Sequence, residues 1–500
     1  MNAAMLFDGM LSIITSPFTL MLCLLGVLIG TLVGALPGVG SVTAMAILLP
    51  ITFSFSPFDA LTLLISIYLG GQYGGRISSI LINVPGDAGA VVTTFDGYPM
   101  SQQGETGKAL MLSAVASFIG SFIGFLGLVF LTNSMANLTI YFGPAEYFTL
   151  LCFALLASGG VTDSKPHKSV ISILLGLLIA MIGMDPVTGD SRMTFGLVDL
   201  WDGISFVVVA IGIFGLSEVL FRIEKGEQKV KLSKFSFQSL FPNMKEIFGS
   251  IFSMIRGGLI GFFIGVLPGA GASIASFFSY STEKKLSKHP EQFGKGATNG
   301  LCGPESANNS SVGGALIPTF SMGIPGSASA AILLGGMMMI GLQPGPSLLR
   351  DSADIVWVAI GALMIANVLL LVLNTVFVPF FTFLIEKIEP YLTVIITSLC
   401  IIGVYAFRNS LFDVGILILF GVIGYFMRKN EFPLAPLLLG MILSPMLEEN
   451  FTQALLLSHN NYMIFISSPI AILFVVLCVL VVLSPLTKKL KLSKLPFLKK

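Results

Sequence analysis

Charge is the scarcest property of this 500-residue sequence, since only 11% of its residues are charged. Soluble domains carry about 25% charged residues, so this chain has too little charge to cover a surface that faces water on all sides. Its 27 Lys and Arg residues nearly balance its 26 Asp and Glu residues, which excludes a nucleic-acid binder that relies on a basic face. With 54% hydrophobic residues, the composition predicts a polytopic membrane protein.

Cysteine and histidine are also scarce. The five cysteines are scattered, which argues against a disulfide framework or a metal site, and the three histidines lie too far apart to indicate a proton relay. The sequence contains no Gly-x-x-x-x-Gly-Lys-[Ser/Thr] phosphate loop, no His-Glu-x-x-His and no Gly-x-Gly-Asp. We therefore expect no metal, no cofactor and no catalytic residue, and an energy source other than ATP bound by this chain.

Long apolar runs are abundant. A helix that spans a bilayer needs about 20 mostly apolar residues, and the chain offers about 11–14 transmembrane segments, several of them interrupted by Gly, Pro or Asn. The predicted fold class is an all-α polytopic membrane protein with broken helices. Full spans are predicted at residues 14–36, 41–58, 109–132, 145–160, 168–184, 204–221, 251–267, 354–385, 391–407, 411–427 and 462–484, and interrupted spans at 60–84, 309–325, 328–342 and 433–447.

The positions of Lys and Arg predict the orientation of the chain. Basic residues gather in segments 222–234 and 284–295 and in the tail after Pro485, so we expect these three regions to be cytoplasmic. Residues 1–10 carry Asp8 and no base, which favours an N-terminus outside the cytoplasm. The first apolar run lacks a basic n-region, so we interpret it as a retained span and not as a signal peptide.

The chain contains an internal repeat. Residues 26–40 match residues 257–271 at an offset of 231, with glycines four apart and a Pro-Gly-x-Gly in both copies. Residues 74–88 match residues 314–328 at an offset of 240. Because two motifs recur in the same order, the sequence predicts two homologous halves.

The repeat defines the expected domains. We predict a first transmembrane repeat at 14–221, a cytoplasmic linker at 222–250, a second repeat at 251–447, an extra C-terminal helix at 462–484 and a Lys-rich cytoplasmic tail at 485–500. If the first half begins outside and the second begins inside, the two repeats are inverted, as in many secondary transporters.

Each glycine ladder ends in a helix break. Glycines four apart form a smooth stripe on which another helix packs closely, but Pro and Gly at the end of the stripe favour non-helical backbone. Broken helices at membrane depth are tolerated where they are buried in protein or line a watery cavity, and their free N–H and C=O groups bind ions. The candidate substrate- or ion-binding residues at the two breaks are Pro37, Gly38, Gly40, Ser41, Pro268, Gly269, Gly271 and Ser273.

A second motif pair places polar residues inside predicted spans, where they are costly and mark substrate or ion pathways. Arg76 is suited to a bidentate pair with a carboxylate, although an interfacial anchor is the alternative; the Asn and Ser residues are alternatively interhelical contacts. Asp87, Asp96 and Glu105 are alternatively residues of a solvated loop. The candidates are Gly74, Gly75, Arg76, Ser78, Ser79, Asn83, Pro85, Gly86, Glu305, Asn308, Asn309, Ser310, Gly313, Gly314, Pro325, Gly326 and Ser327.

Several of these stretches together resemble the large membrane subunit, or permease, of the tripartite tricarboxylate transporters. The resemblance covers about residues 17–455 and departs from the family pattern at Arg76, where a small hydroxyl residue is more usual. The stretches that carry it are Leu36–Gly40, Ser79–Pro99, Pro304–Asn309, Gly323–Ser327, Gln343–Pro346, Gly421–Arg428 and Pro433–Gly440.

The resemblance implies a permease that works with a small four-helix membrane subunit and a periplasmic solute-binding protein in a bacterial inner membrane. It implies a secondary transporter, not an enzyme, that imports citrate-like tricarboxylates or related organic carboxylates with Na⁺ or H⁺ as the coupling ion. One alternative is the same machine with a non-tricarboxylate substrate. A membrane-embedded enzyme is the alternative from a different class, but the repeated features are glycines, prolines and hydroxyls and include no duplicated acid or nucleophile.

Overall fold

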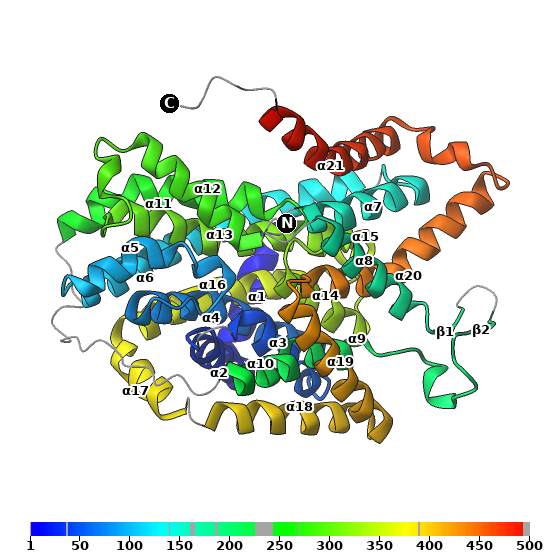
Figure 1. The fold of residues 1–500 in the computed structure, drawn as a ribbon, viewed down its shortest axis with the longest axis horizontal. Coiled ribbons are helices and arrows are strands. Elements are labelled where there is room, and N and C mark those ends of the chain that lie inside the picture. Colours follow the sequence, from blue (N-terminus) through cyan, green and yellow to red (C-terminus); the bar gives the residue numbers. More distant parts are fainter. Residues whose placement is uncertain are drawn as a thin grey trace. The chain divides into compact units, whose positions relative to one another are not determined.

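The computed structural model describes residues 2–36, 39–139, 141–160, 166–185, 189–225, 244–269, 271–388 and 391–493. Apart from one short hairpin, the elements in these residues are helices (Figure 1). Six of the described helices are long and apolar enough to cross a membrane, and seven shorter apolar helices accompany them. The prediction of an all-α polytopic membrane protein is therefore confirmed.

Contacts divide the chain into two compact units, each assembled from two separate segments. Unit 1 comprises Met1–Ala136 and Val207–Phe426, and unit 2 comprises Asn137–Phe206 and Met427–Lys500. The helices within or mainly within unit 1 are α1 (Asn2–Thr15), α2 (Pro17–Gly34), α3 (Gly40–Thr52), α4 (Pro57–Ile82), η1 (Ala88–Ala90), α5 (Thr93–Gln102), α6 (Thr106–Thr139), α9 (Phe206–Ala210), the π-helix η3 (Ile211–Leu216), α10 (Ser217–Lys225), α11 (Met244–Gly265), α12 (Gly271–Leu286), η5 (Pro290–Gln292), α13 (Thr298–Met322), α14 (Ala328–Met339), α15 (Pro346–Asp351), α16 (Ala353–Val376), α17 (Val378–Ile388), α18 (Leu392–Arg408) and α19 (Leu411–Lys429).

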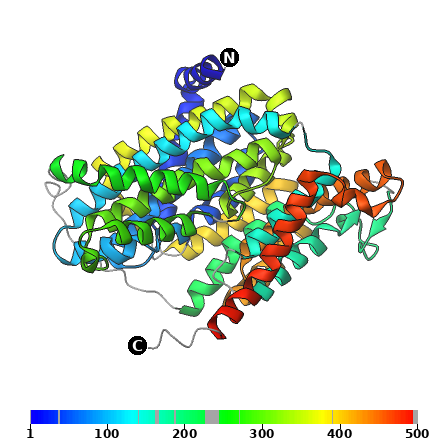
Figure 2. The same ribbon diagram turned by 90° about the horizontal axis from the view of Figure 1, so that it is seen from above.

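Unit 2 is a helical bundle with a small hairpin. Helix α7 contacts α8, α20 and α21, which run beside it (Figure 2). Gly183 and Arg192 pair across the antiparallel hairpin, and Arg192 forms a two-pronged ion pair with Glu448, with nitrogen-to-oxygen distances of 2.6 and 3.2 Å. The elements of unit 2 are α7 (Pro144–Gly160), α8 (Pro166–Ala180), β1 (Gly183–Met184), β2 (Ser191–Arg192), η2 (Val198–Leu200), α20 (Leu434–Leu457), η7 (Tyr462–Ile466) and α21 (Pro469–Ser493).

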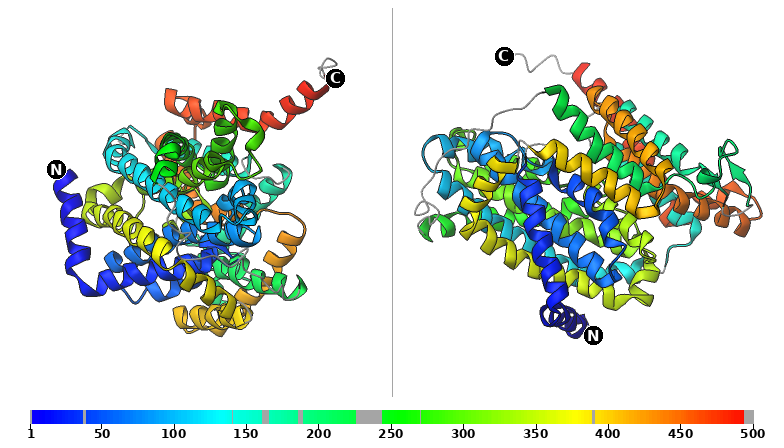
Figure 3. Two further views of the ribbon diagram at one scale, coloured as in Figure 1. Left: turned by 90° about the vertical axis from the view of Figure 1, so that its left-hand side faces the viewer. Right: turned by 90° about the horizontal axis from the view of Figure 1, so that it is seen from below.

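The two most polar long helices form the core of unit 1. Every residue from Ala60 to Leu81 in α4 and from Gly300 to Ser321 in α13 is buried. Helix α13 lies beside α11 and α12 (Figure 1), and α16 packs on α4 and on the N-terminal helix α1 (Figure 3). Polar side chains in α4 and α13 are therefore shielded from lipid by other helices, as their cost in a bilayer requires.

Local sequence signals explain where the first helices begin. Pro57 stands at the start of α4, where its missing N–H costs no hydrogen bond, and Ser56 caps the helix by accepting from the Asp59 N–H at 3.2 Å. Ser16 and Pro17 begin α2 in the same way, with a Thr19 N–H to Ser16 Oγ distance of 3.3 Å.

The glycine ladder of α2 sets its crossing with α4. A Cβ added to Gly30 would lie under 3.0 Å from the Ile67 carbonyl oxygen, and a Cβ added to Gly34 would meet the backbone of Gly71 as closely. Real Cβ atoms essentially never approach so closely, so these two glycines let the two helix backbones touch.

The crossing of α11 with α13 repeats this arrangement contact by contact. Gly261 lies against the backbone of Ala307, and Gly265 lies against that of Ser311. The glycines follow Gly30 and Gly34 by 231 residues, and their partners follow Ile67 and Gly71 by 240. The domain boundaries themselves and the inversion of the halves stay predictions. Helices α10 and α11 occupy both ends of the predicted linker, whose residues 226–243 lie outside the described residues, as do residues 494–500 of the predicted tail.

Candidate functional site

Both glycine ladders end in a helix break in the structure. Helix α2 ends at Gly34 and α3 begins at Gly40; α11 ends at Gly265 and α12 begins at Gly271. Gly40 has a φ of 67° and Gly271 a φ of 59°, in the left-handed region that favours glycine. The candidates Pro37 and Gly38 lie outside the described residues.

The two polar helices also end alike. Asn83, with a φ of 59°, directly follows α4, and Gly323, with a φ of 68°, directly follows α13. In the short loops that follow, the Asp87 side chain accepts from the Gly89 N–H at 2.8 Å, and Ser327 Oγ accepts from the Ala330 N–H at 3.2 Å. Each loop therefore turns the chain sharply and starts the next helical segment with a capping side chain.

Polar side chains from both halves meet at the first break. Ser41 Oγ, in the first turn of α3, lies 3.2 Å from Asp87 Oδ2 and 3.0 Å from Ser329 Oγ. The Gln72 amide nitrogen lies 3.4 Å from Ser41 Oγ, and its buried oxygen has no hydrogen-bond partner among the described residues. We call Ser41, Tyr68, Gln72, Asp87 and Ser329 the first centre; Tyr68 joins it through Ser327, 2.7 Å from its hydroxyl.

Fewer side chains meet at the second break. Gly89, from η1, lies against both the Asn308 side chain and Ala272, because an added Cβ would come under 3.0 Å from each. Asn308 is fully buried, and neither polar atom of its side chain has a hydrogen-bond partner among the described residues. We call Gly89, Ala272 and Asn308 the second centre, together with Val312 and Ser327, which follow Gln72 and Asp87 of the first centre by 240 residues.

A buried network surrounds Glu305. Its carboxylate accepts hydrogen bonds from Thr93 and from Ser117, the latter at 3.1 Å. Ser117 in turn accepts from the Asn309 amide at 2.9 Å. Thr93 comes from α5, Ser117 from α6 and the other two from α13, so one carboxylate joins three helices.

Arg76 is fully buried, which excludes the alternative of an exposed interfacial anchor. Its Nε donates to the Tyr73 carbonyl at 3.0 Å, and its Nη1 donates to the Leu110 carbonyl and to Ser113 Oγ, both at 2.6 Å. Its Nη2 has no hydrogen-bond partner among the described residues. Arg76 is near enough to interact electrostatically with Glu305, but the two form no direct ion pair among the described residues.

The alternative that Asp96 lies in a solvated loop is wrong. It is fully buried in α5, and its Oδ1 accepts from the backbone N–H groups of Gly294, Gly296 and Ala297, at 2.9, 2.8 and 2.7 Å. These residues lead directly into α13. The Asp96 carboxylate therefore holds the N-terminal end of the helix that carries Glu305.

Asp96→Asn should lower the free energy of unfolding by about 1.5–3 kcal/mol, because three amides lose a charged acceptor. Denaturation of the purified protein by SDS in mixed micelles measures this change. The exposed Asp199→Asn is the matched control and should have no measurable effect. Equal stabilities of the two variants would contradict a structural role for the Asp96 charge.

The remaining candidates occupy different surroundings. Ser79 is buried, and its hydroxyl donates to the carbonyl groups of Gly75 and Ala90 at 2.9 and 3.0 Å, whereas the Asn83 side chain is exposed. Ser310 is buried with no hydrogen-bond partner for its hydroxyl among the described residues. Pro325 is buried, Ser78 donates to the Gly75 carbonyl at 3.4 Å, and Ser273 is half-buried in the first turn of α12. The remaining candidates contribute close backbone packing or half-buried loop positions; they are Gly74, Gly86, Gly313, Gly314, Gly326, Pro85, Pro268 and Gly269.

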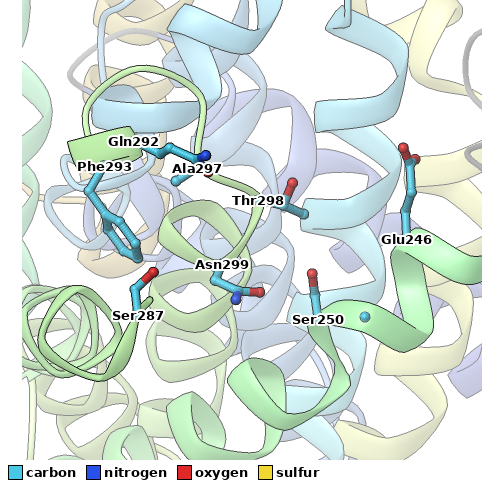
Figure 4. Close-up of a pocket in the computed structure, with 9 residues that line it drawn as sticks. Glu246, Ser250, Ser287, Gln292, Phe293, Ala297, Thr298 and Asn299 are labelled. Atoms are coloured by element: carbon cyan, nitrogen blue, oxygen red, sulfur yellow. The ribbon is translucent and has the colours of Figure 1, made fainter. Parts of the chain in front are cut away.

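A polar pocket of about 310 Å³ lies at the N-terminal end of α13 (Figure 4). None of the sequence-predicted site residues lines it. Its lining comes from α11, α13 and the segment between α12 and α13, and consists of Glu246, Gly249, Ser250, Ser287, Gln292, Phe293, Ala297, Thr298 and Asn299.

The chain was compared with known proteins. The sequence model described as "Tripartite tricarboxylate transporter TctA family" matches residues 20–439. A protein of Agrobacterium vitis, described as "Uncharacterized 52.8 kDa protein in TAR-I ttuC' 3'region", is 38% identical over 473 residues, 94% of each chain. A second protein of that organism, "Uncharacterized protein in TAR-II ttuC' 3'region", is 37% identical over 228 residues, 45% of this chain and 94% of its own. No solved structure matches the chain.

Proposed function

The chain belongs to the tripartite tricarboxylate transporter TctA family, and on that premise we propose that it is the permease that imports organic carboxylates across a bacterial inner membrane. A periplasmic binding protein delivers the substrate, a small membrane subunit accompanies the permease, and an inward gradient of Na⁺ or H⁺ drives transport. Citrate-like tricarboxylates are the first substrate class to test, and other organic carboxylates are the second.

One structural observation supports transport more than any other. Six buried polar atoms of α4 and α13 have no hydrogen-bond partner among the described residues: Gln72 Oε1, Arg76 Nη2, both polar atoms of the Asn308 side chain, Asn309 Oδ1 and Ser310 Oγ. Two of these residues, Gln72 and Asn308, lie beside the two helix breaks. Buried polar atoms normally have partners. A polar solute and its ion would supply such partners during transport, whereas a purely structural core gains nothing from leaving them unpaired.

The chemistry of the site suits a carboxylate and a monovalent cation. Amide groups, helix N-termini and a guanidinium donate to a carboxylate, and hydroxyl and carbonyl oxygens coordinate a cation. Movement of one helix-break repeat against the other would expose the site alternately to the two sides of the membrane.

Uptake of labelled citrate into proteoliposomes tests this function. The vesicles contain this chain and its small subunit, with the cognate binding protein outside, and uptake is compared with and without an inward Na⁺ or proton gradient. We expect accumulation that requires both the binding protein and one of the gradients. Accumulation without any ion gradient would contradict the proposed coupling, and failure of citrate together with a panel of other carboxylates would contradict the substrate class.

Paired variants locate the site within the same assay. Asn309→Ala should reduce the initial rate of uptake by about tenfold, because the substitution removes hydrogen bonds worth about 1–2 kcal/mol in all. The matched control is Asn450→Ala, whose amide donates to the Met446 carbonyl one turn away in unit 2, and which should transport normally. Equal rates for the two variants would remove Asn309 from the site.

A further inference from the structure

The two centres are equivalent positions of the internal repeat. Adding 231 residues to positions near the break and 240 to positions on α4 and its following loop converts one centre into the other. Ser41, Tyr68, Gln72, Asp87 and Gly89 correspond to Ala272, Asn308, Val312, Ser327 and Ser329. Each break is contacted by the segment that follows the polar helix of the other half. Ser329 therefore contacts Ser41 at the first break, just as Gly89 lies beside Ala272 at the second.

The same backbone packing holds both loops in place. A Cβ on Gly86 would lie under 3.0 Å from Gly75 and from the Gly34 carbonyl oxygen. A Cβ on Gly326 would lie under 3.0 Å from Ala315 and from the Gly265 carbonyl oxygen, which are the repeat equivalents of Gly75 and Gly34. Differences between the centres therefore come from side chains and not from a different fold.

The first centre already contains a carboxyl group of the chain itself. The Asp87 carboxylate lies 3.2 Å from Ser41 Oγ, in the first turn of α3. A helix N-terminus attracts negative charge through its free N–H groups, so Asp87 satisfies this helix from within the chain. Gly40 and Ser41 are buried, and the centre is filled by the hydroxyls of Ser41 and Ser329.

The second centre lacks both the carboxyl group and the filling side chains. Ser327 stands where the first centre has Asp87, and Ala272 and Gly89 stand where it has Ser41 and Ser329. The first turn of α12, from Gly271 to Ser273, is half-exposed, and its N–H groups have no partner within the helix. The fully buried Asn308 amide, without a hydrogen-bond partner among the described residues, lies against Gly89 beside this turn.

We propose that the second break, at the N-terminus of α12 beside Asn308, is the subsite that takes a carboxylate group of the transported anion, while Asp87 fills the equivalent subsite at the first break. This assignment rests on the proposed function and adds to it which of the two breaks binds the substrate. The side chain at position 327 then decides whether the second subsite is open, since a carboxylate there would occupy it as Asp87 occupies the first.

Thiol labelling tests the assignment without knowledge of the substrate. In a variant whose five native cysteines are replaced, Ala272→Cys is treated with a sulfonate-bearing and with a trimethylammonium-bearing methanethiosulfonate. We expect the ratio of the reaction rates of the anionic and cationic reagents to be at least about tenfold higher for this thiol than for 2-mercaptoethanol in solution. A tenfold change corresponds to about 1.4 kcal/mol of local attraction. The exposed Gln102→Cys in α5 is the control and should show no such preference.

Adding Ser327→Asp to Ala272→Cys should abolish the anionic preference. Ser327→Asn, which has the size of aspartate without its charge, should retain it. Asp and Asn both cap helices well, so α14 keeps its N-cap in either variant. An Ala272→Cys thiol that reacts with neither reagent, that shows no anionic preference, or that loses it equally with Asn and Asp at position 327 would overturn the proposal.

Citrate uptake separates this proposal from the proposed function. Ser327→Asp should raise the KM for citrate at least about tenfold, because the added carboxylate competes with the substrate for a subsite worth about 1.4 kcal/mol. The matched control Asn461→Asp adds the same charge at an exposed helix cap in unit 2 and should leave the KM unchanged. Anionic labelling without citrate uptake in the unsubstituted chain would support the subsite and contradict the citrate substrate. Citrate uptake with an unaltered KM in Ser327→Asp would support the citrate substrate and contradict the subsite.

Discussion

Replacing Glu305 with glutamine should lower the free energy of unfolding by about 3–5 kcal/mol, the usual cost of leaving a buried charge without its opposite. Glu305 and Arg76 are both fully buried and interact electrostatically across α4 and α13. Glutamine keeps the volume and an acceptor oxygen for Thr93 or Ser117, so the substitution removes charge with little change of shape. The Arg76 guanidinium is then the uncompensated charge.

A double-mutant cycle separates charge from packing. Arg76→Gln should cost about as much as Glu305→Gln, and the double variant should be less destabilised than either single variant because neither charge remains unbalanced. SDS denaturation in mixed micelles measures all three. Arg350→Gln breaks an exposed ion pair with Asp351 and serves as the control, with no measurable loss expected. Strictly additive losses would show that the two buried charges act independently and would contradict the prediction.

Gly261→Val should leave little folded protein in the membrane. The valine Cβ would lie under 3.0 Å from the Ala307 backbone, which belongs to the fully buried helix α13 and has no room to move away. Overpacking a core commonly costs about 1–3 kcal/mol when side chains can rearrange, and a backbone contact allows less relaxation. The yield of monodisperse protein in size-exclusion chromatography should therefore fall by at least about tenfold, which corresponds to about 1.4 kcal/mol.

Gly249 provides the control on the same helix. An added Cβ at Gly249 meets nothing within 4 Å, so Gly249→Ala should fold at least as well as the natural chain, because alanine favours helix more than glycine does. A normal yield for Gly261→Val would show that α11 and α13 can separate at this crossing. It would contradict the close backbone approach on which the repeat is built.

The sequence repeat predicted the helix breaks well, because the physical requirements at those positions are local. Close helix crossings require glycine, and the left-handed backbone at Gly40 and Gly271 also requires it, so both features leave a direct mark on residue identity. The burial of polar residues in α4 and α13 could be predicted for a similar reason, since Arg76, Asn308 and Asn309 are too costly to face lipid.

Side chains that complete the site from other helices could not be predicted in this way. Thr93 and Ser117 contact Glu305 only because α5 and α6 fold back onto α13. Asp96 precedes Gly97 and lies close to Pro99, a pattern typical of a turn, yet it lies in α5 because its carboxylate binds three amides of a distant segment. Tertiary hydrogen bonds here override the local pattern, and a single sequence carries no signal of them.

The internal repeat did not predict the division of the chain into two compact units either. Similarity between residues 26–40 and 257–271 records a duplication, but it does not say which helices pack together. In the structure each compact unit draws one segment from the N-terminal part of the chain and one from the C-terminal part. Helices α7 and α20 contact each other through the rings of Phe148 and Phe451, and a phenylalanine in a single sequence does not indicate its partner.

The exchange of loops between the two breaks has a consequence for biosynthesis. Ser41 meets Ser329, which follows it by 288 positions. A ribosome that adds about 5–20 residues per second needs about 14–58 s to synthesise these 288 residues. Throughout this interval Ser41 and Tyr68 lack their second-half partners, and polar groups without partners are costly in lipid. The nascent first half therefore has to be held away from free bilayer, beside the translocon or an insertion factor, until the second half is made and closes over it.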